Sequence, residues 1–451
     1  MSILRKKSAF KGVKLPENKY TEDEKIETIP LPETATVPLQ QNIGAPCQLK
    51  VKRRDKVKTG QKIADSESFV SAPIHAPISG KVGKTIQLMN PVTGTLVDAI
   101  TIKSDQKDEW VTLEGMAKIK EAGKWEEIFS GIDKLANKEI LGKIREAGIV
   151  GLGGATFPTH VKLSPPPEKN IDTFILNGCE CEPFITSDHR IMLEYGNSVI
   201  LGLYIIRKVL NPDKVYIAIE DNKEDAIENL HKILADMGLD KNIDIISLPS
   251  RYPMGAEKTL IKTLVNREVP MGGLPMDVGV VVNNVATSKA IAEAVIEGKP
   301  LLEKVVTVTG AFRKPKNLLA RIGTPISELV GLCGMVEKER YKIILGGPMM
   351  GVTVSDIDFP VIKGTNCVLV KEADEGLEQN CIRCGRCIDV CPMGLMPLMY
   401  PRFVRHEKYE GCTGYYIDDC IECGSCSFAC PANIPLVGYI KTGKKKLAEK
   451  K

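Results

Sequence analysis

The sequence predicts a multidomain α/β protein in which four unlike units follow one another along the chain. Its 451 residues are too many for one hydrophobic core, since a domain takes about 100–200 residues. Strand-like and helix-like segments alternate through the middle of the chain, which is typical of a largely parallel sheet. Short β-type runs precede that region, and a cysteine-rich stretch with helix-like character follows it. These observations set the order of the units.

The chain begins with a polar segment without periodicity, so we expect an extended arm over residues 1–29. Residues 30–105 hold short runs separated by Gly and Pro, such as QLKV, VKTGQKIA and LVDAITI, and these predict a small all-β domain. Two of its segments, GQKIA at 60–64 and APISGKV at 76–82, resemble the barrel-sandwich hammerhead of biotinyl and lipoyl carrier domains.

The carrier function itself is not expected. In carrier domains a lysine at a hairpin tip holds the prosthetic group. This chain has no lysine between Lys62 and Lys81, and Phe69 stands near the expected tip. His75 has no neighbouring pattern of Cys or carboxylates, so we interpret it as a packed or surface residue.

Residues 106–303 alternate between helix-type and strand-type segments, which predicts an α/β domain. A charged, helix-forming segment at 110–146 leads into a Gly-rich turn. The expected strands lie at 171–176, 214–220, 244–248 and 278–283, and the expected helices at 191–210, 222–237, 257–266 and 287–297. In such a sheet the loops at the carboxyl ends of the strands carry the chemistry.

The last third of the chain predicts two smaller units. Residues 304–360 contain the β runs VVTVTG and KIILGG around one expected helix, Pro325–Cys333, which is typical of a small α+β domain. Residues 361–440 show helix-like segments between cysteine motifs and little strand alternation. Residues 441–451 form a basic tail, interpreted as a solvated, disordered end, with docking to a membrane or a partner as the alternative.

Eight of the 14 cysteines form two runs of one spacing, C-x-x-C-x-x-C-x-x-x-C-P, beginning at Cys381 and at Cys420. This spacing is typical of two [4Fe–4S] clusters, in which the fourth cysteine of each run binds the other cluster. Zinc knuckles are the alternative, but zinc has no use for the third cysteine of each run. The crossing rule gives one cluster Cys381, Cys384, Cys387 and Cys430, and the other Cys420, Cys423, Cys426 and Cys391.

A second informative stretch is the glycine-rich segment GIVGLGGATFPT at 148–159. Glycines let backbone N–H groups close on a phosphate, and a following helix N-terminus favours its charge. The segment is not a dinucleotide GxGxxG motif, because Thr156 stands where the third glycine belongs. No Gly-Lys-Ser/Thr follows it, so it is not a Walker A loop.

Three more motifs follow expected strands: NGCECEP from Asn177, YPMGAEK from Tyr252 and VNNVAT from Val282. Together with the glycine segment and the cysteine runs, they resemble the flavin-bearing, NADH-oxidising subunit of respiratory complex I. That family has a GRGGAGFPTG-like loop for the FMN phosphate, an Asn–carboxylate turn, a Gly-Glu-Glu element and an Asn-Asn-Val-x-Thr element. The resemblance implies a Rossmann-like flavin and nucleotide domain over 106–303 and a β-grasp (SLBB) domain over 304–360.

The order of all four units is similar to that in the C subunits of Rnf complexes, over roughly residues 30–440. Those complexes are membrane-bound, ion-translocating ferredoxin:NAD oxidoreductases. The resemblance implies an NADH-dependent oxidoreductase subunit with FMN, two [4Fe–4S] clusters in a helical ferredoxin-like domain, and NAD(H) as substrate. It also implies integral-membrane and other subunits as partners, ferredoxin as an indirect partner, and a peripheral place on the cytoplasmic side of the cell membrane.

The resemblance also assigns single residues. The glycine segment would cradle the FMN phosphate, and amide, hydroxyl and charged side chains from the other motifs would surround the flavin and the nucleotide. The resemblance assigns Gly151, Gly153, Gly154 and Ala155 to the phosphate cradle, with Lys162 offsetting the phosphate charge. It assigns hydrogen bonds to the flavin to Asn177, Asn283, Asn284 and Thr287, and a place near the flavin ring to Glu182. Phe157 would lie near the nicotinamide or adenine, and Glu257 would bind the NADH ribose. Leu152, Cys179 and Ala256 depart from the family pattern.

Composition excludes several other classes. No apolar run approaches the ~18–20 residues of a spanning helix, and the N-terminus lacks the apolar region of a signal peptide. Free-thiol chemistry then places the protein in a reducing cytosol. The net charge of +4 does not suggest nucleic acid, and no Ser/His/Asp grouping is apparent among five histidines. Two alternatives stay open: a non-enzymatic iron–sulfur adaptor, and the electron-input subunit of a soluble hydrogenase or formate dehydrogenase.

Overall fold

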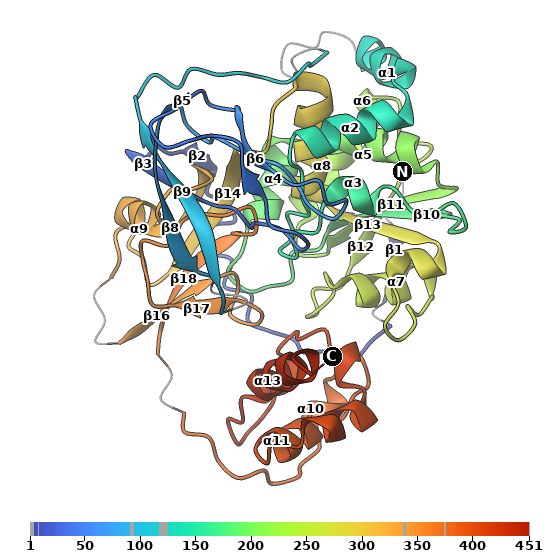
Figure 1. Cartoon of the computed structure of the whole chain (residues 1–451). Coiled ribbons are helices and arrows are strands. Elements are labelled where there is room, and N and C mark those ends of the chain that lie inside the picture. The colour runs from blue at the N-terminus through green and yellow to red at the C-terminus, as the bar shows by residue number, and fades with distance from the viewer. Residues whose placement is uncertain are drawn as a thin grey trace.

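The computed structural model describes residues 4–7, 9–90, 94–116, 125–336, 340–373 and 376–450. The chain folds into a β sandwich, an α/β unit, a mixed β-sheet unit and a cysteine-rich unit of short helices. Figure 1 shows the cysteine-rich unit (red) at the lower end of the molecule, beneath the other three.

The α/β unit is organised around five strands, all parallel, in the order β1-β12-β11-β10-β13. The strands are β1 (Leu4–Arg5), β10 (Thr173–Gly178), β11 (Lys214–Glu220), β12 (Asp244–Leu248) and β13 (Val280–Asn284). The inner strands are runs of Val and Ile buried on both faces, as parallel sheets require. Strand β1 comes from the N-terminal arm, so the expected extended arm supplies an edge strand.

Helices cover both faces of this sheet. Alternate side chains of β10 point to opposite faces: Phe174 and Leu176 into one core, Ile175 into the other. The first core is covered by α1 (Trp125–Lys134), α2 (Asn137–Glu146), α4 (Ser187–Glu194), α5 (Gly196–Leu210), α6 (Glu224–Asp236) and α8 (Val285–Ala292), and the second by α7 (Glu257–Val265). Helix α3 (Thr159–Lys162) follows the glycine segment, η2 (Pro275–Val278) precedes β13, and a π-helical turn, η3 (Glu293–Glu297), extends α8.

The order in which the chain connects the strands marks one edge of the sheet as a place for a ligand. From β10 the chain passes to β11 and β12 on one side and then returns to β13 on the other side of β10. Loops after β10 and β13 therefore diverge at the carboxyl edge of the sheet, the place where open α/β sheets bind ligands. The single helix expected over 191–210 is wrong, because the chain breaks at Tyr195 between α4 and α5.

The β sandwich packs two small antiparallel sheets around a core of Ile, Val and Ala side chains. One sheet has the order β3-β9-β8-β5 and the other β4-β6-β7. The strands are β3 (Thr34–Pro38), β4 (Gln48–Leu49), β5 (Lys56–Val57), β6 (Lys62–Asp65), β7 (Ile74–His75), β8 (Gly80–Met89) and β9 (Leu96–Ser104). His75 is buried here, in agreement with its interpretation as a packed or surface residue.

The third unit has a six-stranded mixed sheet in the order β17-β16-β18-β14-β15-β2, with α9 (Ile326–Cys333) against it. Its strands are β2 (Ile26–Thr28), β14 (Glu303–Gly310), β15 (Lys316–Arg321), β16 (Tyr341–Leu345), β17 (Val352–Val354) and β18 (Cys367–Glu372). The prediction of little strand structure after about residue 365 is wrong at β18. This strand pairs with β14 and β16, and that pairing with distant strands is not visible in the local pattern.

The cysteine-rich unit is built from short helices: α10 (Arg386–Asp389), α11 (Met399–Val404), η4 (Tyr409–Tyr415), η5 (Ile417–Asp419), α12 (Ser425–Phe428) and α13 (Leu436–Ala448). The interpretation of the basic tail as a disordered end is wrong. Helix α13 runs through it and buries Ile440 and Leu447. The amphipathic pattern was hard to recognise in the sequence, because lysines are so frequent in this segment. Among the described residues no helix has the length and apolar character needed to cross a membrane.

Candidate functional site

The glycine segment forms a closed loop between Val150 and Pro158. The Gly151 N–H donates to the Phe157 carbonyl at 2.9 Å, and the Thr156 N–H donates back to the Gly151 carbonyl at 3.1 Å. Gly154 has a φ of +117°, where an L side chain is strained, and open space lies where its Cβ would stand. The loop therefore presents bare backbone on that side.

Three units hold this loop in place. The Leu152 N–H donates to Thr287 Oγ1 at 2.8 Å, and the buried Lys304 Nζ, from β14, donates to the Leu152 carbonyl at 2.7 Å. A Cβ on Gly153 would lie 3.3 Å from the side chain of Asn284. From the β sandwich, the Ile43 N–H donates to the Thr156 carbonyl at 3.3 Å. The structure thus brings the predicted glycines, Asn284 and Thr287 together at the start of α8.

The two asparagines after β13 differ in what their side chains do. Asn284 caps α8: its Oδ1 accepts from the N–H groups of Ala286 and Thr287 at 2.9 and 3.3 Å, and its Nδ2 donates to Asp188 at 2.6 Å. Burial and the charge of Glu180 raise the pKa of Asp188 to about 7. Asn283 is 3% exposed, and its Nδ2 has no hydrogen-bond partner among the described residues.

These features fit FMN. An unpartnered buried amide, as in Asn283, costs stability unless a ligand or water accepts from it, and the Gly154 side of the loop has room for a phosphate. Gly151, Gly153, Gly154 and Ala155 are the residues that would hold the phosphate. The engaged amide of Asn284 instead positions the loop and the helix beneath it.

Three further predicted residues link segments at the same edge of the sheet. Asn177 Nδ2 donates to the Gly255 carbonyl at 2.9 Å, and its Oδ1 accepts from the Cys179 N–H at 3.0 Å. Lys162 of α3 forms an ion pair with Glu257, the first residue of α7. Lys162, predicted for the phosphate charge, and Glu257, predicted for the ribose, therefore contact each other. Asn177 joins the turn after β10 to the turn before α7.

Glu182, after β10, contacts the β-sheet unit. Its carboxylate accepts from the N–H groups of Met349 and Met350 at 3.2 and 2.8 Å, in the turn between β16 and β17, and its Oε1 lies 3.4 Å from Tyr252 Oη. Burial raises the pKa of Glu182 to about 7, against the two backbone N–H groups that favour its charged form. The carboxylate thus joins the α/β unit to the β-sheet unit.

The raised pKa predicts a pH-dependent stability. Because the pKa of Glu182 is about 7 in the folded chain against an ordinary 4.5, the folded state binds more protons between these values. The free energy of unfolding should therefore fall as pH rises through this window. Glu182→Gln should remove this part of the pH dependence in unfolding curves measured from pH 4.5 to 8. Glu228→Gln, at an exposed position of α6, is the control, and an unchanged profile for Glu182→Gln would refute the assignment.

Cysteines of the two runs lie next to each other in the structure, and the crossing of the cluster ligands stays a prediction. Cys391, from the first run, lines one small apolar cavity together with Cys420, Cys423 and Cys426 of the second. Burial and these neighbouring thiols raise the pKa of Cys426. In the other set, burial raises the pKa of Cys387, whose neighbouring thiols include Cys430 of the second run and Cys381. A cavity lined by four thiols fits a [4Fe–4S] cluster.

Within the described ranges, no three Cys, His, Asp or Glu side chains already stand at the spacing of a bound metal ion. The donor sets and their surroundings support the cluster assignment. The cavity of Cys391 is closed by Leu395, whose N–H donates to Cys391 Sγ at 3.3 Å; N–H bonds of this kind stabilise thiolate ligands.

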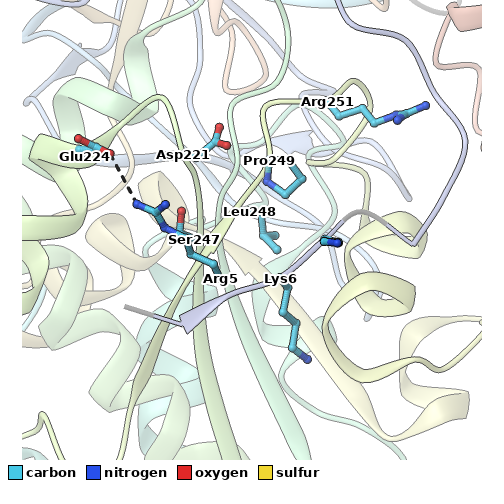
Figure 2. A pocket seen from close by; sticks show the side chains of 9 residues that line it. Arg5, Lys6, Asp221, Glu224, Ser247, Leu248, Pro249 and Arg251 are labelled. Carbon is cyan, nitrogen blue, oxygen red and sulfur yellow. Dashed lines mark ion pairs between the residues drawn. The ribbon is translucent and has the colours of Figure 1, made fainter. Parts of the chain in front are cut away.

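A further cavity lies elsewhere, at the carboxyl ends of β11 and β12 beside the N-terminal arm (Figure 2). It measures about 590 Å³ and is lined by both signs of charge, Arg5, Lys6, Lys7 and Arg251 with Asp221 and Glu224. Arg5 faces Glu224 across it at 4.0 Å, with both side chains 77% exposed. None of the predicted site residues lines this cavity, so it is separate from the glycine loop.

Sequence inspection missed three residues that the structure places at the site. Lys304 and Asp188 support the glycine loop from beneath, and Tyr252 contacts the second cysteine run. Lys304 had a visible signal, because a lone lysine inside the apolar run EKVVTV falls among buried strand positions. Tyr252 stands in a motif already singled out, but nothing local shows which of its atoms is used.

The fold and the site define a class: a flavin and iron–sulfur electron-transfer protein, with a glycine phosphate loop in one unit and paired cysteine runs in another. Four family models match successive parts of the chain, one for each of its four units. They are the RnfC barrel sandwich hybrid domain over residues 7–107, the Nuo51 FMN-binding domain over 144–293, the SLBB domain over 305–353 and the 4Fe-4S dicluster domain over 380–434.

The curated relatives define the family more narrowly. The C subunit of the proton-translocating ferredoxin:NAD(+) oxidoreductase complex of Clostridium ljungdahlii is 47% identical, over 90% of this chain and 87% of its own. The C subunit of the Na(+)-translocating complex of Acetobacterium woodii is 43% identical, over 92% and 91%. The C subunit of the ion-translocating oxidoreductase complex of Rhodobacter capsulatus is 41% identical, over 95% and 81%. The chain belongs to this family of C subunits of ion-translocating ferredoxin:NAD(+) oxidoreductase complexes.

Among solved structures, a chain of an NAD+-reducing [NiFe]-hydrogenase shares the fold. The TM-score is 0.50 and the sequence identity 17%, over 76% of this chain and 67% of that chain. This likeness concerns the fold alone.

Proposed function

We propose that this chain is the peripheral subunit that passes electrons between NAD(H), FMN and two [4Fe–4S] clusters in a membrane-bound, ion-translocating ferredoxin:NAD+ oxidoreductase. The observation that carries the proposal is the glycine loop, held between Thr287 and Lys304. The unpartnered amide of Asn283 at the end of β13 supports it. Its position at the carboxyl edge of a parallel sheet is that of a Rossmann-like nucleotide site.

Each part of the site has a task in this function. When bound, FMN accepts a hydride and releases electrons one at a time, which joins two-electron NADH chemistry to one-electron clusters. The backbone N–H groups from Gly151 to Ala155 hold its phosphate, and Asn283 donates a hydrogen bond to the flavin. Lys304 and Asp188 are buried polar side chains that keep the loop and the capping Asn284 in place. The Lys162–Glu257 pair stands where the nucleotide would enter, with Glu257 accepting from ribose hydroxyls.

The proposed partners are the integral-membrane and other subunits of the same complex, with ferredoxin reached indirectly. The lack of a spanning helix among the described residues is compatible with a peripheral place, which we assign to the cytoplasmic side. Membrane fractions carrying the tagged chain together with other subunits of the complex would support this assignment. A chain that stays entirely with a soluble hydrogenase or formate dehydrogenase would favour the alternative.

Composition tests the proposal directly. The chain purified under anaerobic conditions should hold about one FMN and about eight irons with matching acid-labile sulfide. Fewer than about four irons per chain would contradict two clusters. Clusters without bound FMN would favour the alternative of a non-enzymatic electron-transfer adaptor.

Glu257→Ala tests the nucleotide side of the site. Loss of a charged hydrogen-bond acceptor is expected to weaken reduction by NADH about tenfold, seen as a higher KM, with iron content unchanged. Glu268→Ala is a matched control, because Glu268 pairs with Lys262 on the same unit and its side chain is 78% exposed. Equal NADH kinetics for both variants would place the nucleotide elsewhere.

A further inference from the structure

The second cysteine run is docked against the rest of the molecule by one buried hydrogen bond. Tyr252 Oη donates to the carbonyl of Cys423 at 2.6 Å, and Tyr252 is 2% exposed. Cys423 packs with Tyr252 and Val13 in a small apolar cluster that also includes Ile421 and Met349. This seam joins the cysteine-rich unit to the arm, the α/β unit and the β-sheet unit.

The next residue of the run shows how close this contact is. Gly424 has a φ of +81°, and a Cβ there would stand 2.7 Å from the carbonyl oxygen of Met349. Met349 belongs to the turn whose N–H groups donate to Glu182. The second run therefore meets a surface built jointly by the turn after β10, the turn before α7 and the turn between β16 and β17.

The first cysteine run is placed differently. Cys381 and Cys384 are exposed, and between them Ile382 is 68% exposed. Cys423 and Cys426 of the second run are each 7% exposed. Cys423 of the second run is thus enclosed at the seam, whereas Cys381 and Cys384 of the first run open toward the outside of the molecule.

Tyr252 also connects this seam to the nucleotide side of the site. It begins the segment that ends at Glu257, which pairs with Lys162 just after the glycine loop. Five residues reach at most about 18 Å, so the Cα atoms of Tyr252 and Glu257 are no farther apart than that. Asn177 fixes the middle of the segment through the Gly255 carbonyl at 2.9 Å.

The backbone of Tyr252 is held as firmly as its side chain. Its N–H donates to the Val13 carbonyl at 3.0 Å, and its carbonyl accepts from the Val13 N–H at 2.9 Å. The ring is therefore fixed at both ends, by the arm and by the cysteine run. Tyr252 therefore sets the distance between the α/β unit and the cysteine-rich unit.

We propose that Tyr252 is a positioning residue that holds the second cysteine run against the flavin unit. Cys391, Cys420, Cys423 and Cys426 then form the inner ligand set, and Cys381, Cys384, Cys387 and Cys430 form the outer set that faces a partner. This inference rests on the proposed function, to which it adds the order of the two ligand sets.

Tyr252→Phe tests the inference because it removes only the hydroxyl. In the whole chain, isolated anaerobically with its cofactors, backbone amide exchange over 424–426 should become about threefold faster or more as the docking loosens. The midpoint potential of the inner set, followed by its EPR signal, should shift, because loosened docking changes the solvent exposure that tunes a cluster's potential. Iron and flavin content should be unchanged, and so should the signal of the outer set. The Cys384→Ser chain, which disables the outer set, assigns the two signals beforehand.

Tyr204→Phe is the matched control. Tyr204 lies on α5 of the same α/β unit and donates to Asp133 at 3.0 Å, away from the cysteine runs. A shift of the outer signal in Tyr252→Phe, or amide exchange and potentials equal to those of Tyr204→Phe, would overturn the inference. Reduction of the unmodified chain by NADH tests the proposed function separately, because amide exchange over 424–426 does not depend on it.

Discussion

Replacing Cys391 by Ser should cost the chain roughly half of its iron and should abolish the EPR signal of the second cysteine run, not of the first. Cys391 belongs to the first run by sequence but shares a cavity with Cys420, Cys423 and Cys426. A serine there leaves three thiolates for a cluster that needs four. Iron and acid-labile sulfide analysis, followed by EPR of the dithionite-reduced chain, measures the loss.

The matched control is Cys412→Ala. Cys412 lies outside both runs and is buried in the core of the same unit beside Gly443. Its replacement should leave both clusters in place, so that the iron of the two variants can be compared at equal folding. If Cys391→Ser instead removed the signal of the Cys381 set and left that of the Cys420 set, the crossing of the runs would be wrong.

Gly153→Leu is expected to have the largest effect on the flavin. A Cβ at this position would already lie 3.3 Å from the side chain of Asn284, so the longer leucine must push the loop away from α8. The backbone N–H groups would then no longer converge on a phosphate, and bound flavin should fall by about tenfold or more. Flavin released by acid from a known amount of chain, with iron as the internal reference, gives the measurement.

Gly142→Leu provides the comparison, because it adds the same side chain to an exposed helical glycine of α2 with no atom near the new Cβ. It should keep both flavin and iron. Full flavin in Gly153→Leu would place the phosphate away from this loop.

The strands were the most predictable part of the fold. The expected ranges 214–220 and 244–248 match β11 and β12, because each is an apolar run bounded by polar or turn residues and buried on both faces. The break between α4 and α5 could not be foreseen in the same way. It falls where a Cβ on Gly196 would approach Ile233 of α6 to 2.4 Å, a contact that depends on how two helices pack.

In the candidate site, too, local motifs could be predicted and contacts between distant residues could not. The glycine loop and the cysteine runs are local motifs, which their residue types and spacing identify in the sequence. The support of the loop by Lys304 and the docking of the second run by Tyr252 link residues more than 150 positions apart. Helix α13 was missed for a related reason, because its lysines line the outer face of a helix whose other face packs on α11 and η4.

The central claim is that one chain joins NADH to two iron–sulfur clusters through a flavin. Titrating the anaerobic chain with NADH, while recording visible and EPR spectra, tests it most directly. The flavin absorbance should bleach, and EPR signals of reduced clusters should appear in the same titration. Bleaching without any cluster signal, in a chain whose clusters dithionite reduces, would contradict the claim, and so would an unchanged flavin spectrum.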